Sequence, residues 1–154
     1  MTFEQLNQIL DGDQKQCDWR QTSGGGWIQK SARVECEENI RDDAQVFGNA
    51  QVSGNARMFG NARMSGGAWV SGDARVFGNA RVFGGAWETS PLFIQGTRFS
   101  LTNCKPGFIQ IGCECHSFSE WTRVGLAIAR QNDFSQAQIK EYRAYIRLFK
   151  QTGK

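Results

Sequence analysis

The middle of this chain repeats with a period of six residues. An aliphatic residue or Met occupies every sixth position without a gap. The members of this series are Ile28, Val34, Ile40, Val46, Val52, Met58, Met64, Val70, Val76 and Val82. Alanine recurs four positions later, from Ala32 to Ala86, with one interruption at Glu38. No helix has a period of six, so the pattern favours a coil of short strands and sharp corners.

One repeat, residues 74–79, shows how such a coil forms. Strand alternation places its Ala and Val on one side of the backbone and Arg75 and Phe77 on the other. Small and branched side chains suit a narrow interior, so we expect Arg75 and Phe77 outside. Gly78 and Asn79 both favour the positive φ of a tight corner. Three such repeats close a triangular coil of 18 residues, and coils stack about 4.8 Å apart through parallel hydrogen bonds.

The aliphatic residue at the first position and the Ala at the fifth resemble the hexapeptide-repeat family over residues 27–96. The resemblance implies a left-handed parallel β-helix, and hence a mainly β chain. The slot after the aliphatic residue, usually small or acidic in that family, here holds residues such as Phe47, Ser53 and Phe59. This form of the repeat is most similar to hexapeptide proteins of phages and prophages. The resemblance also implies a homo-oligomer, a trimer or a dimer, because such proteins commonly associate side by side.

Three regions are expected along the chain. Residues 1–26 form an N-terminal helix and a polar loop, residues 27–96 the hexapeptide-repeat solenoid, and residues 97–154 a β-hairpin followed by two helices. We expect the two terminal regions to cover the ends of the coil, because exposed strand edges invite aggregation. The triplet Gly24 to Gly26 is interpreted as a flexible lead-in, since no helix follows it as a phosphate-binding loop requires.

Short motifs place the helices and the hairpin. Each helix is expected to begin at a capping box. The three boxes are Thr2 with Gln5, Ser117 with Glu120, and Ser135 with Gln138. The sequence Lys105-Pro106-Gly107 predicts a type II turn between strands at residues 99–104 and 108–111.

Composition sets the class of protein. The chain has no apolar run of 18 residues, so no membrane span is expected. No basic leader precedes an apolar segment at the N-terminus, and five Cys is an odd number. Both features favour a reducing cytoplasm. Residues 1–43 carry 5 basic and 9 acidic side chains, whereas residues 44–154 carry 13 and 6. This basic excess after the acidic start favours an anionic partner.

Residues 18 apart are expected to stack along the outside of the coil and to form three faces of Arg and aromatic side chains. The candidate binding residues are Arg57, Phe59, Arg75, Phe77, Arg63, Arg81, Trp69 and Trp87. Arginine binds phosphate bidentately, and aromatic rings stack on bases, so a nucleotide or nucleic acid fits these faces. The alternative is an oligomer seam or the floor beneath a terminal helix. A basic stripe from Lys140 to Lys150 is interpreted as a solvated helix face.

Catalytic and metal chemistry is poorly supported by the sequence. Cys104, Cys113, Cys115 and His116 have zinc-ligand chemistry, but their Cys-x-Cys-His spacing is tighter than the usual knuckle. Buried apolar Cys is the favoured interpretation, so no metal or cofactor is expected. The one His lies outside the repeats, whereas hexapeptide acyltransferases use a His borne by a repeat and carbonic anhydrases of the same fold need several. The sequence therefore favours a protein that is not an enzyme.

The functional expectation combines these observations with the resemblance. We expect a non-enzymatic binding protein of the host cytoplasm that antagonises host defence, for example as an anti-CRISPR protein. It would bind a nucleotide signal, a nucleic acid or a defence protein through the Arg and aromatic surface. The alternative is an acyltransferase of the hexapeptide family that uses an acyl-CoA donor, with His116 as the base. A purely structural oligomer is the third candidate.

Overall fold

The computed structural model describes residues 1–153, and the chain divides into two compact units. The first unit comprises Met1–Asn79 and Phe83–Ser90. The second comprises Ala80–Val82 and the chain from Pro91 onward. No helix of the described residues is long and apolar enough to cross a membrane.

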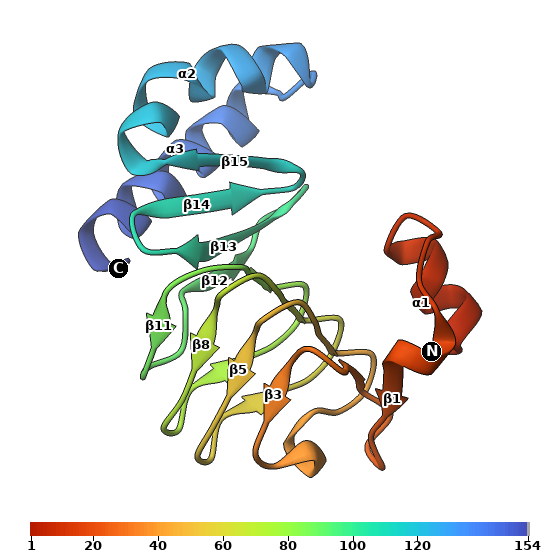
Figure 1. Ribbon diagram of the computed structural model, residues 1–154. Helices are drawn as coiled ribbons and strands as arrows, with labels where there is room; N and C mark the ends of the chain where they lie inside the picture. The colour runs from red at the N-terminus through yellow and green to blue at the C-terminus, as the bar shows by residue number, and fades with distance from the viewer. Residues whose placement is uncertain (154) are drawn as a thin grey trace. The chain divides into compact units, whose positions relative to one another are not determined.

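The first unit is a parallel β-solenoid, as the six-residue period predicts. Its short strands are β2 (Trp27–Gln29), β3 (Arg33–Val34), β4 (Gln45–Val46), β5 (Gln51–Val52), β6 (Arg57–Met58), β7 (Arg63–Met64), β8 (Trp69–Val70), β9 (Arg75–Val76) and β11 (Ala86–Trp87). They form three parallel sheets, β2–β4–β7, β3–β5–β8–β11 and β6–β9. Figure 1 shows β3, β5, β8 and β11 side by side.

The aliphatic series forms three inward columns whose members lie 18 residues apart. The columns are Ile28–Val46–Met64, Val34–Val52–Val70 and Ile40–Met58–Val76. All of these side chains except Val34 are buried, together with the Ala series from Ala32 to Ala74. The expected interior is therefore confirmed, because a period of six brings every third repeat to the same face of the coil.

Glycine alone takes the left-handed conformation at the regular corners. Gly48, Gly54, Gly60, Gly66, Gly72 and Gly78 have φ between 62° and 69°. The Asn residues that follow these glycines do not, so the expectation of positive φ at both corner positions is wrong for Asn. A side chain at Gly66 would place its Cβ 2.6 Å from the carbonyl oxygen of Phe83 in the next coil. The corner at Gly66 is thus closely stacked on the next coil, and Gly there avoids both this contact and the strain of a positive φ.

In the first coil, side chains replace the missing Gly-Asn corners. The backbone amides of Gly48, Gly54 and Gly60 donate to Gln29 Oε1, Glu35 Oε2 and Asp42 Oδ2 at 2.8, 2.8 and 2.9 Å. A 3₁₀ turn, Glu37–Asn39, completes that coil. The carboxamide of Gln29 and the carboxylates of Glu35 and Asp42 therefore satisfy backbone donors that would otherwise face the open edge.

The repeat slips by one residue at β11. A continued period of 18 would place Glu88 inward beside Val70 and leave Trp87 outside, but Trp87 is the residue paired with Val70. Trp87 is 1% exposed, and Ala86, expected inside, is exposed. Burying an unpaired carboxylate costs several kcal/mol, whereas burying an indole is favourable. The slip therefore buries Trp87 and leaves Glu88 in solvent.

The N-terminal segment covers one side of the solenoid. Helix α1 (Phe3–Ile9) begins at the expected capping box of Thr2 and Gln5. Its Leu6 is fully buried in a cluster with Trp19 and Trp27, and Phe3 and Phe47 pack against that cluster. This side of the coil is therefore the floor for the terminal helix, as one of the two alternatives predicts.

The glycine triplet is an ordered turn, so its interpretation as a flexible lead-in is wrong. Strand β1 (Trp19–Gln21), preceded by the 3₁₀ turn Gln16–Asp18, pairs antiparallel with β2. Gly25 lies in the turn between them with φ of 96°. A Cβ at Gly26 would lie 2.7 Å from the carbonyl oxygen of Ile40. These glycines permit close backbone approach at the first coil.

The second unit contains a four-stranded antiparallel sheet and two helices. The sheet order is β12 (Phe93–Gln95), β13 (Ser100–Lys105), β14 (Phe108–Ile111) and β15 (Glu114–Ser117), and the helices are α2 (Phe118–Gln131) and α3 (Gln136–Thr152). Strand β10 (Arg81–Val82) also belongs to this unit. The expected hairpin is β13–β14, and Gly107 in its turn has φ of 77°. Both predicted capping boxes are formed, at Ser117 and Ser135.

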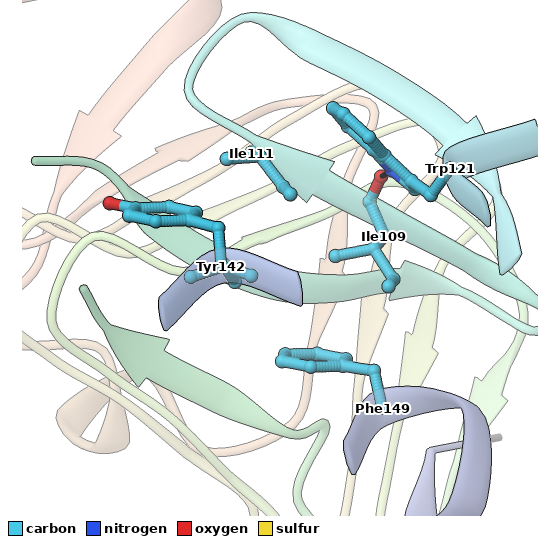
Figure 2. Packing of buried hydrophobic residues seen from close by; sticks show 6 residues of the cluster. Ile109, Ile111, Trp121, Tyr142 and Phe149 are labelled. Carbon is cyan, nitrogen blue, oxygen red and sulfur yellow. Dashed lines mark hydrogen bonds between the residues drawn. The ribbon is translucent and has the colours of Figure 1, made fainter. Parts of the chain in front are cut away.

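Large side chains from the sheet and both helices form the core of the second unit. Ile109, Ile111, Trp121, Tyr142 and Phe149 lie together in Figure 2. The Trp121 indole donates to the backbone carbonyl of Ile109 at 2.8 Å, so the buried ring has its polar atom satisfied. This contact fixes α2 on β14, and Tyr142 and Phe149 fix α3.

Candidate anion-binding face

Two arginines lie side by side on the outer face of β6 and β9. Arg57 and Arg75 are direct partners in the parallel register, and both side chains are exposed. They point outward because the next residues, Met58 and Val76, are buried in an inward column. The predicted stacking of these arginines at a distance of 18 residues is therefore confirmed.

Two phenylalanines lie next to the arginines on the same face. The rings of Phe59 and Phe77 are stacked, with centroids 5.5 Å apart and planes inclined by 11°. Phe59 is half-buried, and Phe77 is 39% exposed. The predicted ladder of rings is thus present. We name Arg57, Arg75, Phe59 and Phe77 the β6–β9 face.

The charge of this face is not neutralised within the described chain. Among residues 1–153, no acidic side chain forms an ion pair with Arg57 or Arg75. The strand spacing places the backbones of Arg57 and Arg75 about 4.8 Å apart, and two unit charges at that separation would repel by about 1 kcal/mol in water. An anion between them would remove this repulsion and accept hydrogen bonds from both guanidinium groups.

Arg41 belongs to the same face and was missed in the sequence. Its backbone amide donates to the carbonyl of Met58, and Ile40 bridges Met58 in parallel, so Arg41 lies in register with Phe59. The signal was available, because Arg41, Phe59 and Phe77 are spaced by 18 residues. Arg41 therefore lies at the end of the column formed by Phe59 and Phe77 and adds a third exposed cation beside the β6–β9 face.

The remaining candidate residues do not gather at this face. Trp69 is 49% exposed on the β8 face, and its indole donates to Ser53 Oγ at 3.0 Å. Trp87 is buried and cannot contact a ligand at the surface, so its assignment to an exposed face is wrong. Arg63 lies in β7 beside Gln45, whereas Arg81 belongs to the second unit.

The cysteine and histidine cluster forms contacts within the sheet. Cys104 on β13 and Cys115 on β15 have their sulfur atoms 3.5 Å apart. Burial first, and then the neighbouring Cys115 thiol, raises the pKa of Cys104 to about 12. Cys113 lies exposed in the turn before β15. His116 Nε2 lies 3.0 Å from Glu114 Oε2.

These residues do not converge on one point. No group of three or more His, Cys, Asp or Glu side chains within residues 1–153 is arranged to hold a metal ion. A thiol with so high a pKa is also a poor nucleophile near neutral pH. The described Cys and His side chains make separate pairwise contacts instead, and the β6–β9 face is the stronger candidate site.

The comparisons with known proteins agree with the geometry of the coil. Residues 50–66 and 74–89 match the family model of the YdcK beta-solenoid repeat. The chain carries a β-solenoid repeat. The first matched segment contains Arg57 and Phe59, and the second contains Arg75 and Phe77. No curated protein and no solved structure matches the chain.

Proposed function

We propose that this protein is a binding protein for ligands that combine a planar base with phosphate, and that the β6–β9 face is its binding site. The observation that supports this proposal is the pairing of Arg57 with Arg75 beside the stacked rings of Phe59 and Phe77. A nucleotide and a short single-stranded nucleic acid share this chemistry, and the experiment below distinguishes them.

Each part of the face has a role in such a complex. Arg57 and Arg75 would donate charge-assisted hydrogen bonds to phosphate oxygens, in the bidentate geometry that guanidinium favours. The exposed part of the stacked Phe59 and Phe77 pair would contact the base, and base–aromatic contacts contribute about 1–3 kcal/mol per base. The parallel strands hold the backbone positions of these groups at a fixed spacing, and ordering each exposed Arg side chain costs about 0.5–1.5 kcal/mol of the binding energy.

We propose that the biological role is sequestration, as the resemblance to phage hexapeptide proteins implies. A protein that withdraws a nucleotide signal from a host defence needs an accessible binding face and no catalytic group. An oligomer would present several copies of the face at once. This role depends on the binding itself, so binding is the property to test first.

Isothermal titration calorimetry tests the proposal with three ligands, which are a mononucleotide, a cyclic dinucleotide and an oligothymidylate of twelve nucleotides. The double variant R57E/R75E should weaken binding of the active ligand at least about 100-fold, because two charge-assisted hydrogen bonds contribute about 1.5–3 kcal/mol each. The matched control is K30E/R33E, which makes the same change in net charge at two exposed positions of the same unit. It should bind almost as well as the parent protein.

Three outcomes would overturn the proposal. Binding of none of the three ligands would exclude a base-and-phosphate site. Equal loss in both double variants would indicate a general charge effect. The third is a change in the mass measured by light scattering for R57E/R75E without any loss of ligand binding, which would identify the face as an oligomer seam.

A further inference from the structure

A groove of about 380 Å³ runs between α2 and α3 in the second unit. Leu126 of α2 and Ile139 and Ile146 of α3 line it with aliphatic side chains. Gly125 of α2 faces Ile146 of α3, because a Cβ at this position would lie 3.9 Å from Ile146 Cδ1. The groove therefore has a well-packed apolar floor, supported by the core in Figure 2.

Four cations surround this floor. They are Arg123 of α2 and Arg143, Arg147 and Lys150 of α3, and none of the residues that line the groove is acidic. All four are exposed, and no ion pair within residues 1–153 includes any of them. Like charges at such helical spacings destabilise a helix slightly. A basic rim around an apolar floor therefore favours an occupant of the opposite charge.

The nearby carboxylates are occupied elsewhere. Glu120 is bonded to Ser117 in the capping box of α2, which lowers its pKa, with a smaller contribution from the charge of Arg123. Glu141 accepts hydrogen bonds from the backbone amide and hydroxyl of Thr97. Neither of these residues lines the groove, so the rim keeps its positive charge.

The floor fits an aliphatic occupant better than a base. The aromatic residues at the groove, Trp121 and Tyr142, are only 4% and 5% exposed, so their rings are not available for stacking on a nucleotide. The α3 residues that line the groove extend from Ile139 to Lys150. At 1.5 Å per residue, this span is about 16 Å, or three turns of helix.

We propose that the groove between α2 and α3 binds an acidic amphipathic helix of a partner protein. Large aliphatic side chains on one face of that helix would pack against the apolar floor of the groove, and Glu or Asp residues would pair with the cations of the basic rim. This is the helix-in-groove mode, in which residues at i, i+4 and i+7 anchor the peptide. The site is independent of the β6–β9 face and gives the protein a second interaction surface.

A designed peptide tests this proposal directly. The probe is a labelled 14-residue helix with Leu at i, i+4, i+7 and i+11 and Glu at most other positions. A second peptide replaces every Glu by Lys, and a third keeps the composition but scatters the Leu positions. Fluorescence anisotropy should show binding of the acidic amphipathic peptide, and at least tenfold weaker binding of the other two.

Variants of the protein assign the binding to the groove. The double variant R143E/R147E should weaken binding of the acidic peptide at least tenfold. The control R130E/K140E makes the same charge change at exposed positions of the same two helices outside the groove, and should leave binding unchanged. Circular dichroism shows whether both variants keep their helices, and nuclear magnetic resonance shift changes at Leu126 and Ile146 provide a second readout on the parent protein.

The proposal fails if the acidic peptide does not bind at millimolar concentration, or if it binds no better than the lysine peptide. It also fails if R130E/K140E loses as much affinity for the acidic peptide as R143E/R147E does. Displacement of the peptide by oligothymidylate would identify the groove as a nucleic-acid site instead. Loss of nucleotide binding in R57E/R75E with peptide binding intact shows that the two surfaces are separate.

Discussion

The burial of Trp87 gives the most specific test of the solenoid. Trp69 and Trp87 occupy equivalent places in the sequence repeat, because each follows Gly-Gly-Ala. The structure makes them different, with Trp69 half exposed and Trp87 1% exposed beside Val70. The substitutions W69A and W87A are therefore a matched pair that differs mainly in the burial of the ring.

The expected difference follows from the buried area. A fully buried Trp removes about 200 Å² from water, which corresponds to about 5 kcal/mol at 25 cal/mol per Å². Core Trp-to-Ala changes cost about 3–5 kcal/mol. Trp69 buries about half as much, so its loss should cost about 1.5–2.5 kcal/mol. The indole hydrogen bonds to Ser53 and to the Gly84 carbonyl, at 3.0 and 2.9 Å, contribute similarly to both.

Urea unfolding followed by far-ultraviolet circular dichroism measures this difference. With an m-value of about 2 kcal/mol per M, W87A should unfold about 1 M earlier in urea than W69A. Equal midpoints would show that both rings are equally exposed, and the slip in register at β11 would be refuted. In that case Glu88 would lie inside, and E88V would stabilise the protein, whereas we expect it to have little effect.

Three further predictions concern the corners and the titrating groups. G66A should destabilise the protein by about 2–4 kcal/mol in chemical denaturation, because φ of Gly66 is 62° and the new Cβ would meet a backbone oxygen. The control G67A has open space around its new Cβ and should leave the stability unchanged or raise it slightly. T97V should raise the pKa of Glu141 toward its ordinary value in a carboxyl NMR titration. Because this pKa is lowered in the folded state, the Glu141 carboxylate stabilises the fold at pH values above its pKa in the unfolded chain. That stabilisation is lost as the pH falls through the pKa of Glu141 in the folded state. Cys104 should resist iodoacetamide at pH 8 in peptide mapping while exposed thiols react, since a pKa of about 12 leaves only about one thiolate in 10,000; its rapid labelling in the folded protein would contradict the burial.

The sequence predicts those parts of the structure that depend on local spacing. The inward columns follow from a strict period, and the helix starts at Thr2, Ser117 and Ser135 follow from capping boxes. The stacking of Arg57 on Arg75 follows from the same period. In each case, residues close in sequence or separated by one full coil determine the contact.

Other features depend on competition between distant groups, which spacing does not reveal. The slip at Trp87 is a choice between burying an indole and burying a carboxylate, and Gly84-Gly85 resembles the regular corners. Strand β15 was not expected as a sheet member, because the sequence predicted only the two strands of the hairpin at residues 99–104 and 108–111. The groove between α2 and α3 needs both helices in place, since Arg123 is far in sequence from Arg143.

Photochemical cross-linking tests the central claim most directly. A single-stranded oligonucleotide or a nucleotide carrying 5-bromouracil is irradiated with the protein, and the digest with trypsin is mapped by mass spectrometry. Trypsin cuts after Arg57, Arg63, Arg75 and Arg81, so Phe59 and Phe77 fall in the separate peptides 58–63 and 76–81. We predict that the adducts concentrate on these two peptides. Adducts confined to the helices of the second unit, or spread evenly over the basic peptides, would contradict a binding site on the β6–β9 face.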